Sequence, residues 1–402
     1  MRINSRKVTA LIMAACTAAA STGYAVPASD KTEDMTAVYL GVENYGAEET
    51  NKDNKENFRY RFETDGKEAV YSIMNGTKDE KGNFDYPIQN VLKEGYEYTI
   101  TVEDGVVTHA EEIAEEEIPY EPLVSGEAGV KTLQNFLKTA LAPVGTTLYI
   151  YGGGWDWQDV GSSIQARTLG VSSDWVEFFE SQDEDYTFKE VDGDEKKADP
   201  ANSYYPYGAY NEYYYAGLDC SGYLGWVLYN TFETENGGDG YVGGSTGFAK
   251  RLSERGWGEW TQDLGEKNGS DCYDMKPGDI MSIHGHVWIS LGTCDDGSVV
   301  IAHSTPSKSW TGQPGGGVQI SAIGKDESCE AYALADEYMS ECYPLWYERY
   351  GTTLCDPNVY FTFEGENAGR FTWNITGENG GLEDAEAVQG MKPAEVLEIL
   401  FA

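Results

Sequence analysis

Basic residues are scarce in this 402-residue chain, which has 28 Lys and Arg against 68 Asp and Glu and a formal net charge of −40. Such an acidic surface repels phosphate backbones and anionic lipid headgroups, so nucleic-acid binding is not expected. No apolar run after the N-terminus is long enough to cross a bilayer, and we expect no transmembrane segment in the mature protein. Hydrophobic residues make up 40% of the chain, enough for a sizeable core, and the length predicts two or three domains.

Cysteine is also sparse, with seven residues in the chain. Without Cys16 and Cys220 five remain, an odd number that fits two bridges and one free thiol in an oxidising location. Cys272 and Cys294 bracket an expected hairpin and form the first pair to test. A fully reduced chain fits the sequence equally well.

The first 25 residues differ from the rest of the chain. Basic residues precede an apolar run over Val8–Ala20, and Gly23 and Ala25 then give a small-x-small cleavage pattern. This order is typical of a secretory signal peptide over residues 1–25, so we expect a secreted or cell-surface protein. One alternative stays open, because the sequence before Cys16 resembles a lipoprotein cleavage site that would leave Cys16 lipidated.

Three segments are expected after the signal peptide. Residues 26–125 contain short alternating runs, such as Tyr96–Val102, that indicate a small β-rich domain ending in an acidic linker. Residues 126–355 form a second domain with a long, polar, tyrosine-rich insertion at 155–216. Residues 356–402 are expected to be a C-terminal extension.

Local patterns predict further elements in the second domain and the extension. The apolar spacing over Gly129–Leu141 fits an amphipathic helix. In the extension, Val359–Phe363 and Phe371–Ile375 resemble strands, and Pro393 stands near the start of a final helix.

The segment Leu218–Tyr229 carries the first candidate for chemistry. Its apolar residues recur at helical spacing and Asp219 is a good N-cap residue, so Cys220 is expected in the first turn of a helix. The helix dipole and the unpaired amides there favour an anion, which predicts a lowered thiol pKa and donors for an oxyanion. A buried, unreactive cysteine is the competing interpretation.

The histidines supply the second candidate. Ile280–Ile283 and His286–Gly292 are typical of consecutive strands. Period-two alternation places His286, Trp288 and Ser290 on one face, where they are expected to line a cleft.

A third strand, Val299–His303, ends in another histidine. His303 suits the residue that orients a catalytic base through the far nitrogen of its ring. The expected arrangement is therefore Cys220 as nucleophile, His286 as base and His303 as the orienting residue.

A metal site is the alternative explanation for these histidines. His284, His286 and His303 lie close together in the sequence, and imidazole suits zinc. Neither an HExxH nor a CxxC pattern is present, and a metal would leave Cys220 unexplained. We therefore expect no metal and no cofactor, and we assign His284 no role.

Several motifs together resemble the NlpC family of papain-like cell-wall cysteine peptidases. The nucleophile and base motifs are Asp219–Gly222, Gly278–Ile280 and His286–Gly292. Ile301–Ser304 and Gly315–Ile320 are similar to the family's third-residue strand and the strand after it, and Tyr149–Gly153 is similar to its tyrosine–double-glycine element. The resemblance covers only about residues 143–153 and 217–321.

The resemblance implies an α+β, papain-like fold in which the helix bearing the nucleophile packs on an antiparallel sheet. The residues it implies for the triad are Cys220, His286 and His303, and those for substrate positioning are Tyr149, Asp219 and Ser221. The implied reaction is hydrolysis of a peptidoglycan stem peptide between a γ-linked D-glutamyl residue and the following diamino acid. Two alternatives stay open: an amidase or acyltransferase with the same fold, and a non-catalytic cell-surface binding protein.

One departure from the family concerns the insertion. The family's tyrosine element stands just before the cysteine, whereas here some seventy positions separate Tyr149 from Cys220. We hypothesise that the insertion is a lid that narrows substrate choice, and a surface excursion unrelated to catalysis is the alternative. The ligand of the β-rich domain and the oligomeric state stay open.

Overall fold

The computed structural model describes only part of the chain. The described residues are 32–44, 58–73, 77–78, 84–85, 88, 92–113, 120–150, 152–155, 163, 165–181, 187–189, 214–232, 241, 243–306, 311–314, 316–362, 365–377 and 381–402. They contain both helices and sheets, which confirms the predicted mixed α+β class. The predicted signal peptide and Cys16 lie outside them.

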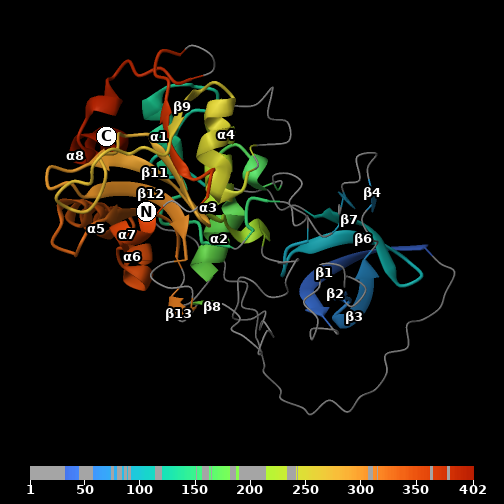
Figure 1. Cartoon of the computed structure of the whole chain (residues 1–402). Helices are drawn as coiled ribbons and strands as arrows, with labels where there is room; N and C mark the ends of the chain where they lie inside the picture. Colours follow the sequence, from blue (N-terminus) through green and yellow to red (C-terminus); the bar gives the residue numbers. More distant parts are fainter. Residues whose placement is uncertain are drawn as a thin grey trace.

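The N-terminal part forms a closed five-stranded barrel in the order β1-β2-β3-β7-β6 (Figure 1). Its strands are β1 (Thr32–Asn44), β2 (Phe58–Thr64), β3 (Lys67–Ile73), β6 (Glu97–Glu103) and β7 (Val106–Glu112), and β4 (Thr77–Lys78) pairs separately with β5 (Phe84–Asp85). Along β6 the buried residues alternate with exposed ones, as the sequence predicted. The inward side chains form a core of their own around Tyr39, Phe62 and Ile100.

A seven-stranded sheet organises the remainder of the chain, in the order β15-β14-β12-β11-β10-β16-β9. Its strands are β9 (Gly258–Thr261), β10 (Ile280–Ile283), β11 (His286–Thr293), β12 (Val299–Thr305), β14 (Gly317–Ile323), β15 (Leu354–Cys355) and β16 (Gly369–Trp373). All neighbours are antiparallel except β14 and β15. The three consecutive strands predicted at Ile280–Ile283, His286–Gly292 and Val299–His303 are confirmed as β10, β11 and β12.

All described helices except α7 cover one face of this sheet (Figure 1). The helices are α1 (Leu133–Leu141), α2 (Ser173–Ser181), α3 (Cys220–Phe232), α4 (Phe248–Glu254), α5 (Glu330–Cys342), α6 (Pro344–Tyr350), α7 (Pro357–Tyr360) and α8 (Pro393–Phe401), with short 3-10 turns at Gln165–Arg167, Tyr214–Ala216, Ser245–Gly247 and Val388–Gly390. Of these, α7 belongs to the opposite face. Val287, Ile289 and Leu291 of β11 point into the main core, which confirms the predicted alternation.

The opposite face of the sheet is also buried, which corrects one expectation. Trp288 and Ser290 were expected to line a cleft, but they are 1% and 0% exposed. Trp288 belongs to a second core cluster with Ile301 and Phe361, because the chain after β15 folds back over this face. At the start of β11, His286 lines a pocket.

The C-terminal extension does not stand apart from the second domain. Strand β16 lies inside the sheet between β10 and β9, and Val396 and Leu397 of α8 belong to the main core. The strand-like segment 359–363 was predicted wrongly, since Pro357–Tyr360 is helical. Asp356 explains this, because its side chain caps the helix by accepting from the Asn358 amide, and Pro at the first position favours a helix start.

Helix α3 runs through the centre of the larger unit. Twelve of its thirteen residues are buried, because it packs on other elements all round rather than on one side. The Tyr223 hydroxyl donates to the Ala140 carbonyl of α1 at 2.6 Å, and Trp226 meets Trp175 of α2 with ring centroids 5.8 Å apart. The first residue of α3 is therefore held rigidly.

The barrel contacts the larger unit through charged side chains of α2. Lys93, just before β6, forms ion pairs with Asp174 at 2.8 Å and with Glu112 at 3.1 Å. The Tyr96 hydroxyl bonds to Asp174 at 3.1 Å and to Glu177 at 3.2 Å. Lys93 and Asp174 are both buried, so this contact is an internal ion-pair network.

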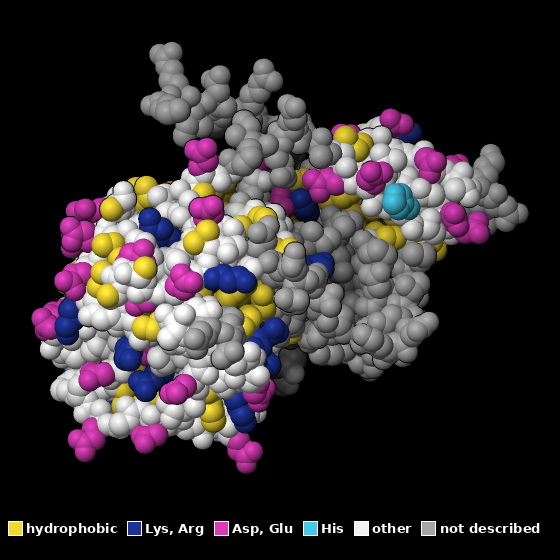
Figure 2. Space-filling view, turned by 90° about the horizontal axis from the view of Figure 1, so that it is seen from above, with side chains coloured by type: hydrophobic (Ala, Val, Ile, Leu, Met, Phe, Trp, Pro, Cys, Tyr) yellow, Lys and Arg dark blue, Asp and Glu magenta, His cyan; other side chains and the backbone are white. Residues whose placement is uncertain are grey.

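The visible surface carries the charge imbalance without forming a single-sign patch. Figure 2 shows acidic side chains spread over the face, with Lys, Arg and apolar side chains between them. Such a pattern is typical of a solvated acidic surface. Among the described residues, no helix is long and apolar enough to cross a membrane.

Candidate active site

The tyrosine–double-glycine element lies against the segment that precedes the cysteine. The Leu218 amide donates to the Leu148 carbonyl at 3.1 Å, and the Asp219 amide donates to the Gly153 carbonyl at 3.0 Å. Gly222 faces Gly153 so closely that a Cβ on Gly222 would collide with the Gly153 carbonyl oxygen. The two motifs therefore meet in space despite the insertion between them.

Asp219 caps helix α3, as its position in the sequence predicted. Its Oδ1 accepts from the Gly222 amide at 2.6 Å and from the Ser221 hydroxyl at 3.0 Å, and its Oδ2 accepts from the Gly152 amide at 3.2 Å. Burial raises the pKa of Asp219 to about 6, although these hydrogen bonds oppose the rise. The cap thus ties Gly152 to the first turn of the helix.

Cys220 is the first residue of α3 and is 4% exposed. Its thiol lies 3.8 Å from the carbonyl oxygen of Gly285, the residue directly before His286. Burial raises the pKa of the Cys220 thiol, and the charge of Asp219 adds to the rise. The predicted lowering of this pKa is therefore wrong for the resting protein, because removal from water outweighs the amide donors near the sulfur.

His286 and His303 form a direct hydrogen bond. The Nε2 atom of His286 lies 3.0 Å from Nδ1 of His303, and Nε2 of His303 lies 3.0 Å from the Ser321 hydroxyl oxygen. Burial lowers the pKa of His286 to about 4, and burial together with His286 lowers the pKa of His303. Both imidazoles are therefore neutral in the resting site.

This chain of hydrogen bonds constrains which nitrogens carry protons. If Ser321 accepts from Nε2 of His303, then Nδ1 of His303 must accept from Nε2 of His286. Nδ1 of His286 is then unprotonated and able to act as a base. Ser321 lies on β14 and is fully buried, and no local pattern predicted its part in this hydrogen-bond network.

Cys220 and His286 line the same pocket, with a volume of about 810 Å³. All three residues expected to position the substrate, Tyr149, Asp219 and Ser221, line it as well. Tyr149 is fixed through its backbone, whose amide donates to the Gly316 carbonyl at 2.7 Å. His303 does not line the pocket among the described residues and reaches it only through His286.

Two aromatic residues of the pocket were missed in the sequence. The Trp155 indole N–H donates to the Ser221 hydroxyl at 3.2 Å, which extends the Asp219 hydrogen bonds along one wall. Tyr360 forms part of another wall and meets His286 with ring centroids 5.5 Å apart. Trp155 lies two residues after the double-glycine element, so proximity to that motif was a usable signal. No comparable signal pointed to Tyr360.

The histidines do not form a metal site among the described residues. His284 is exposed, and the one group there with suitable ligand atoms close together is Cys294, Asp296 and Glu330. Those carboxylates already accept hydrogen bonds from backbone amides. Asp296 accepts from the Glu330 amide at 2.9 Å, and Glu330 accepts from the Asp295 amide at 2.9 Å. The group thus joins a hairpin turn to the start of α5.

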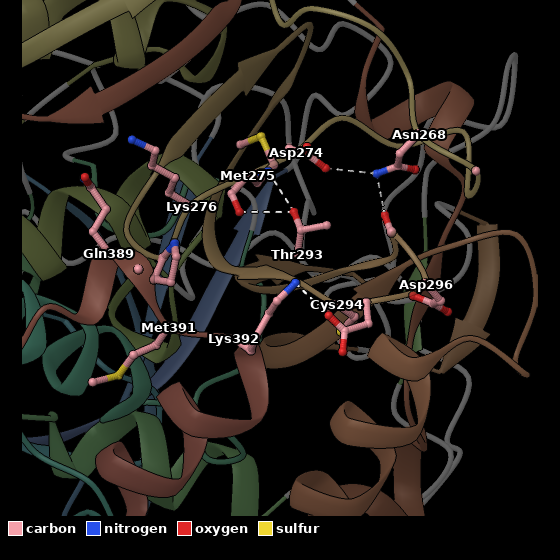
Figure 3. Close-up of a pocket in the computed structure, with 15 residues that line it drawn as sticks. Asn268, Asp274, Met275, Lys276, Thr293, Cys294, Asp296, Gln389, Met391 and Lys392 are labelled. Atoms are coloured by element: carbon pink, nitrogen blue, oxygen red, sulfur yellow. Dashed lines mark hydrogen bonds and ion pairs between the residues drawn. The ribbon is translucent and has the colours of Figure 1, made fainter.

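A second pocket, of about 550 Å³, lies at the opposite end of β11 from His286 (Figure 3). Thr293 there bonds to the backbone of Met275, and Lys392 pairs with Asp295 at 2.9 Å. Cys294 lies in this region without a bridge. All six described cysteines are free thiols, so the pairing of Cys272 with Cys294 is not formed.

The described parts of the insertion contribute to the core. Trp175 of α2 is fully buried, and the Asn230 side chain of α3 accepts from the Gly170 amide at 2.7 Å. The short strand β8 (Thr187–Lys189) pairs with β13 (Thr311–Pro314). Within the insertion, to which the lid hypothesis applies, most of the segment from 182 to 213 lies outside the described residues.

Comparison of the chain with protein-family models, with curated proteins and with solved structures gives no match in any of the three.

Proposed function

We propose that this chain is an exported cysteine peptidase with a papain-like, NlpC-type catalytic domain. Its proposed substrate is a peptidoglycan stem peptide, cut at the bond between a γ-linked D-glutamyl residue and the following diamino acid. The observation that supports this most is the common pocket of Cys220 and His286, with His286 bonded to His303 at 3.0 Å. The substrate class rests on the resemblance of the motifs alone.

In the proposed reaction, His286 acts as a general base because the resting thiol and imidazole are neutral. Nδ1 of His286 takes the thiol proton while the Cys220 sulfur attacks the carbonyl carbon of the scissile amide. The Cys220 amide, at a helix end where backbone N–H groups lack intrahelical partners, stabilises the tetrahedral oxyanion.

The second half of the reaction uses the same groups. The C–N bond breaks, and His286 returns its proton to the leaving amine. Water then attacks the thioester with His286 again as base, which releases the carboxylic acid and restores the thiol. His303 keeps the imidazole of His286 in the required tautomer throughout.

The test is cleavage of purified muropeptides by the mature protein, with products identified by mass spectrometry. Cys220→Ala is expected to abolish cleavage while the circular dichroism spectrum and the melting temperature stay close to wild type, because the side chain lost is small. Cys342→Ala is the matched control, since Cys342 is a partly buried free cysteine outside the pocket. An equally active Cys220→Ala protein would remove the nucleophile assignment.

The identity of the products distinguishes the proposed peptidase from the amidase and acyltransferase alternatives. A new amine and a new carboxylic acid at the predicted bond indicate hydrolysis of the stem peptide. Cleavage at the bond between sugar and peptide would indicate an amidase, and transfer of the acyl group to an added amine would indicate an acyltransferase. No product from any muropeptide would leave the binding-protein alternative.

A further inference from the structure

Helix α7 places an aromatic ring beside the two histidines. The helix begins at Pro357 after the Asp356 cap and ends at Tyr360. The centroid of the Tyr360 ring lies 5.5 Å from that of His286 and 5.8 Å from that of His303, with interplanar angles of 77° and 60°. Because the two imidazoles are themselves 5.2 Å apart, the three rings form one edge-to-face cluster.

The hydroxyl of Tyr360 is anchored by two neighbouring side chains. It takes part in hydrogen bonds with the side chains of Cys355 and Thr305, and burial together with Cys355 holds the pKa of the phenol far above its usual value. The phenol therefore stays neutral. With its backbone fixed by α7 and its hydroxyl fixed by these two partners, the ring has little freedom to rotate.

His286 needs such support because of its place in the sheet. It is the first residue of β11 and lines the pocket, whereas His303 is fully buried within β12 and does not line it. The hydrogen bond to His303 fixes one nitrogen but leaves the ring free to tilt about that contact. A flat ring packed against both imidazoles removes this freedom and shields their hydrogen bond from water in the pocket.

We propose that Tyr360 is a positioning residue that clamps the His286–His303 pair and keeps Nδ1 of His286 directed at Cys220. The inference rests on the proposed function for its catalytic consequence, but its physical content concerns only the thiol and the two imidazoles. It also gives a role to a segment that lies outside the motifs of the catalytic domain. Misplacing a base by about 1 Å lowers a rate by roughly 100-fold.

The experiment compares two substitutions at this position. Tyr360→Phe keeps the flat ring and loses the hydroxyl, whereas Tyr360→Leu loses the ring. Asn358→Ala is the control, because Asn358 is exposed on the same helix and does not line the pocket. The first readout is the rate of Cys220 alkylation by iodoacetamide between pH 4 and 9. Alkylation is followed by mass spectrometry of the peptide that contains Cys220, so the measurement needs no peptidoglycan substrate.

Tyr360→Leu is expected to slow alkylation at neutral pH by about 10-fold or more and to move its acid limb toward pH 6.5, since His286 then gains access to water. Tyr360→Phe and Asn358→Ala are expected to stay within about 3-fold of wild type. With muropeptides, Tyr360→Leu is expected to lower kcat far more than it raises KM. A rate and an acid limb in Tyr360→Leu that match those of Tyr360→Phe would overturn the proposal.

Two controls keep the result decisive. If Tyr360→Leu lacks the wild-type circular dichroism spectrum, Tyr360→Met replaces it, because methionine fills similar space without a flat ring. If wild-type protein cleaves no muropeptide, the proposed function fails, while the alkylation profiles still decide the role of Tyr360.

Discussion

His286 is the residue whose proton determines when the proposed base can work. Burial lowers its pKa to about 4 from the usual 6.5. A base must be unprotonated, so activity is absent below the folded-state pKa and appears as pH rises through it. We expect kcat/KM for muropeptide cleavage to rise through an acid limb near pH 4 and to be level by about pH 6.

Asp219 provides the internal check on this pH profile, because its pKa of about 6 falls within the same range. Asp219→Asn keeps a good N-cap residue and removes the titrating group. If the limb near pH 4 belongs to His286, it stays in this variant. A wild-type limb near pH 6 that disappears in Asp219→Asn would instead assign the titration to Asp219 and contradict the neutral, desolvated imidazole.

At the scale of elements, the contact between the double-glycine element and α3 depends on the absence of a side chain. A Cβ on Gly222 would collide with the Gly153 carbonyl oxygen, and backbone cannot yield as a flexible side chain can. Gly222→Ala is therefore expected to lower the free energy of unfolding by about 1–3 kcal/mol, despite the better helix propensity of alanine. Activity should fall at least about 10-fold, since Gly152 and the Asp219 cap shift with the loop.

Urea unfolding and muropeptide cleavage measure these two effects. Gly390→Ala is the matched control, because a Cβ there meets open space; it is expected to change neither quantity measurably. A Gly222→Ala protein as stable and as active as Gly390→Ala would show that the two motifs are not in tight contact.

How far the sequence predicts these elements depends on whether the signal is local. The cap at Asp219, the helix after Cys220 and the strand that begins at His286 follow from propensity and periodicity within a few residues. Helix α7 was mistaken for a strand, because alternating apolar residues over five positions fit either structure and the capping by Asp356 was not weighed. Tyr360 was missed since only tertiary packing brings it to the histidines.

The burial of both sheet faces had no local signal either. The alternation along β11 correctly placed Val287 and Trp288 on opposite faces of the sheet. Such a two-residue period shows only that the two faces differ, not which residues cover each face. The covering of the second face comes from residues after Cys355, far along the chain. Because such long-range packing has no local signal, segment 356–402 was predicted to be an extension, although its strand β16 lies inside the sheet. The thiol pKa was mispredicted because burial is a tertiary property.

At the scale of the whole molecule, the ion-pair network of Lys93 links the barrel to the larger unit. Burial alone would lower the pKa of Lys93, but the nearby carboxylates of Asp174 and Glu112 outweigh it and raise the pKa. The charge is therefore retained inside the contact. Because Asp174 is 6% exposed, removing Lys93 leaves a buried carboxylate without its cation. Lys93→Met is expected to lower the free energy of unfolding by about 3 kcal/mol.

Urea unfolding followed by both circular dichroism and tryptophan fluorescence tests this expectation, with two comparison proteins. Lys325→Met removes a cation from an exposed pair with Asp271 at 3.1 Å and is expected to cost less than about 1 kcal/mol. The double variant Lys93→Met/Asp174→Asn is expected to recover part of the loss, since the uncompensated charge is gone. If Lys93→Met costs no more than Lys325→Met, the barrel is not held to α2 by this network in solution. A barrel transition that separates from the main one only in Lys93→Met would show, in contrast, that these ion pairs make the two units unfold together.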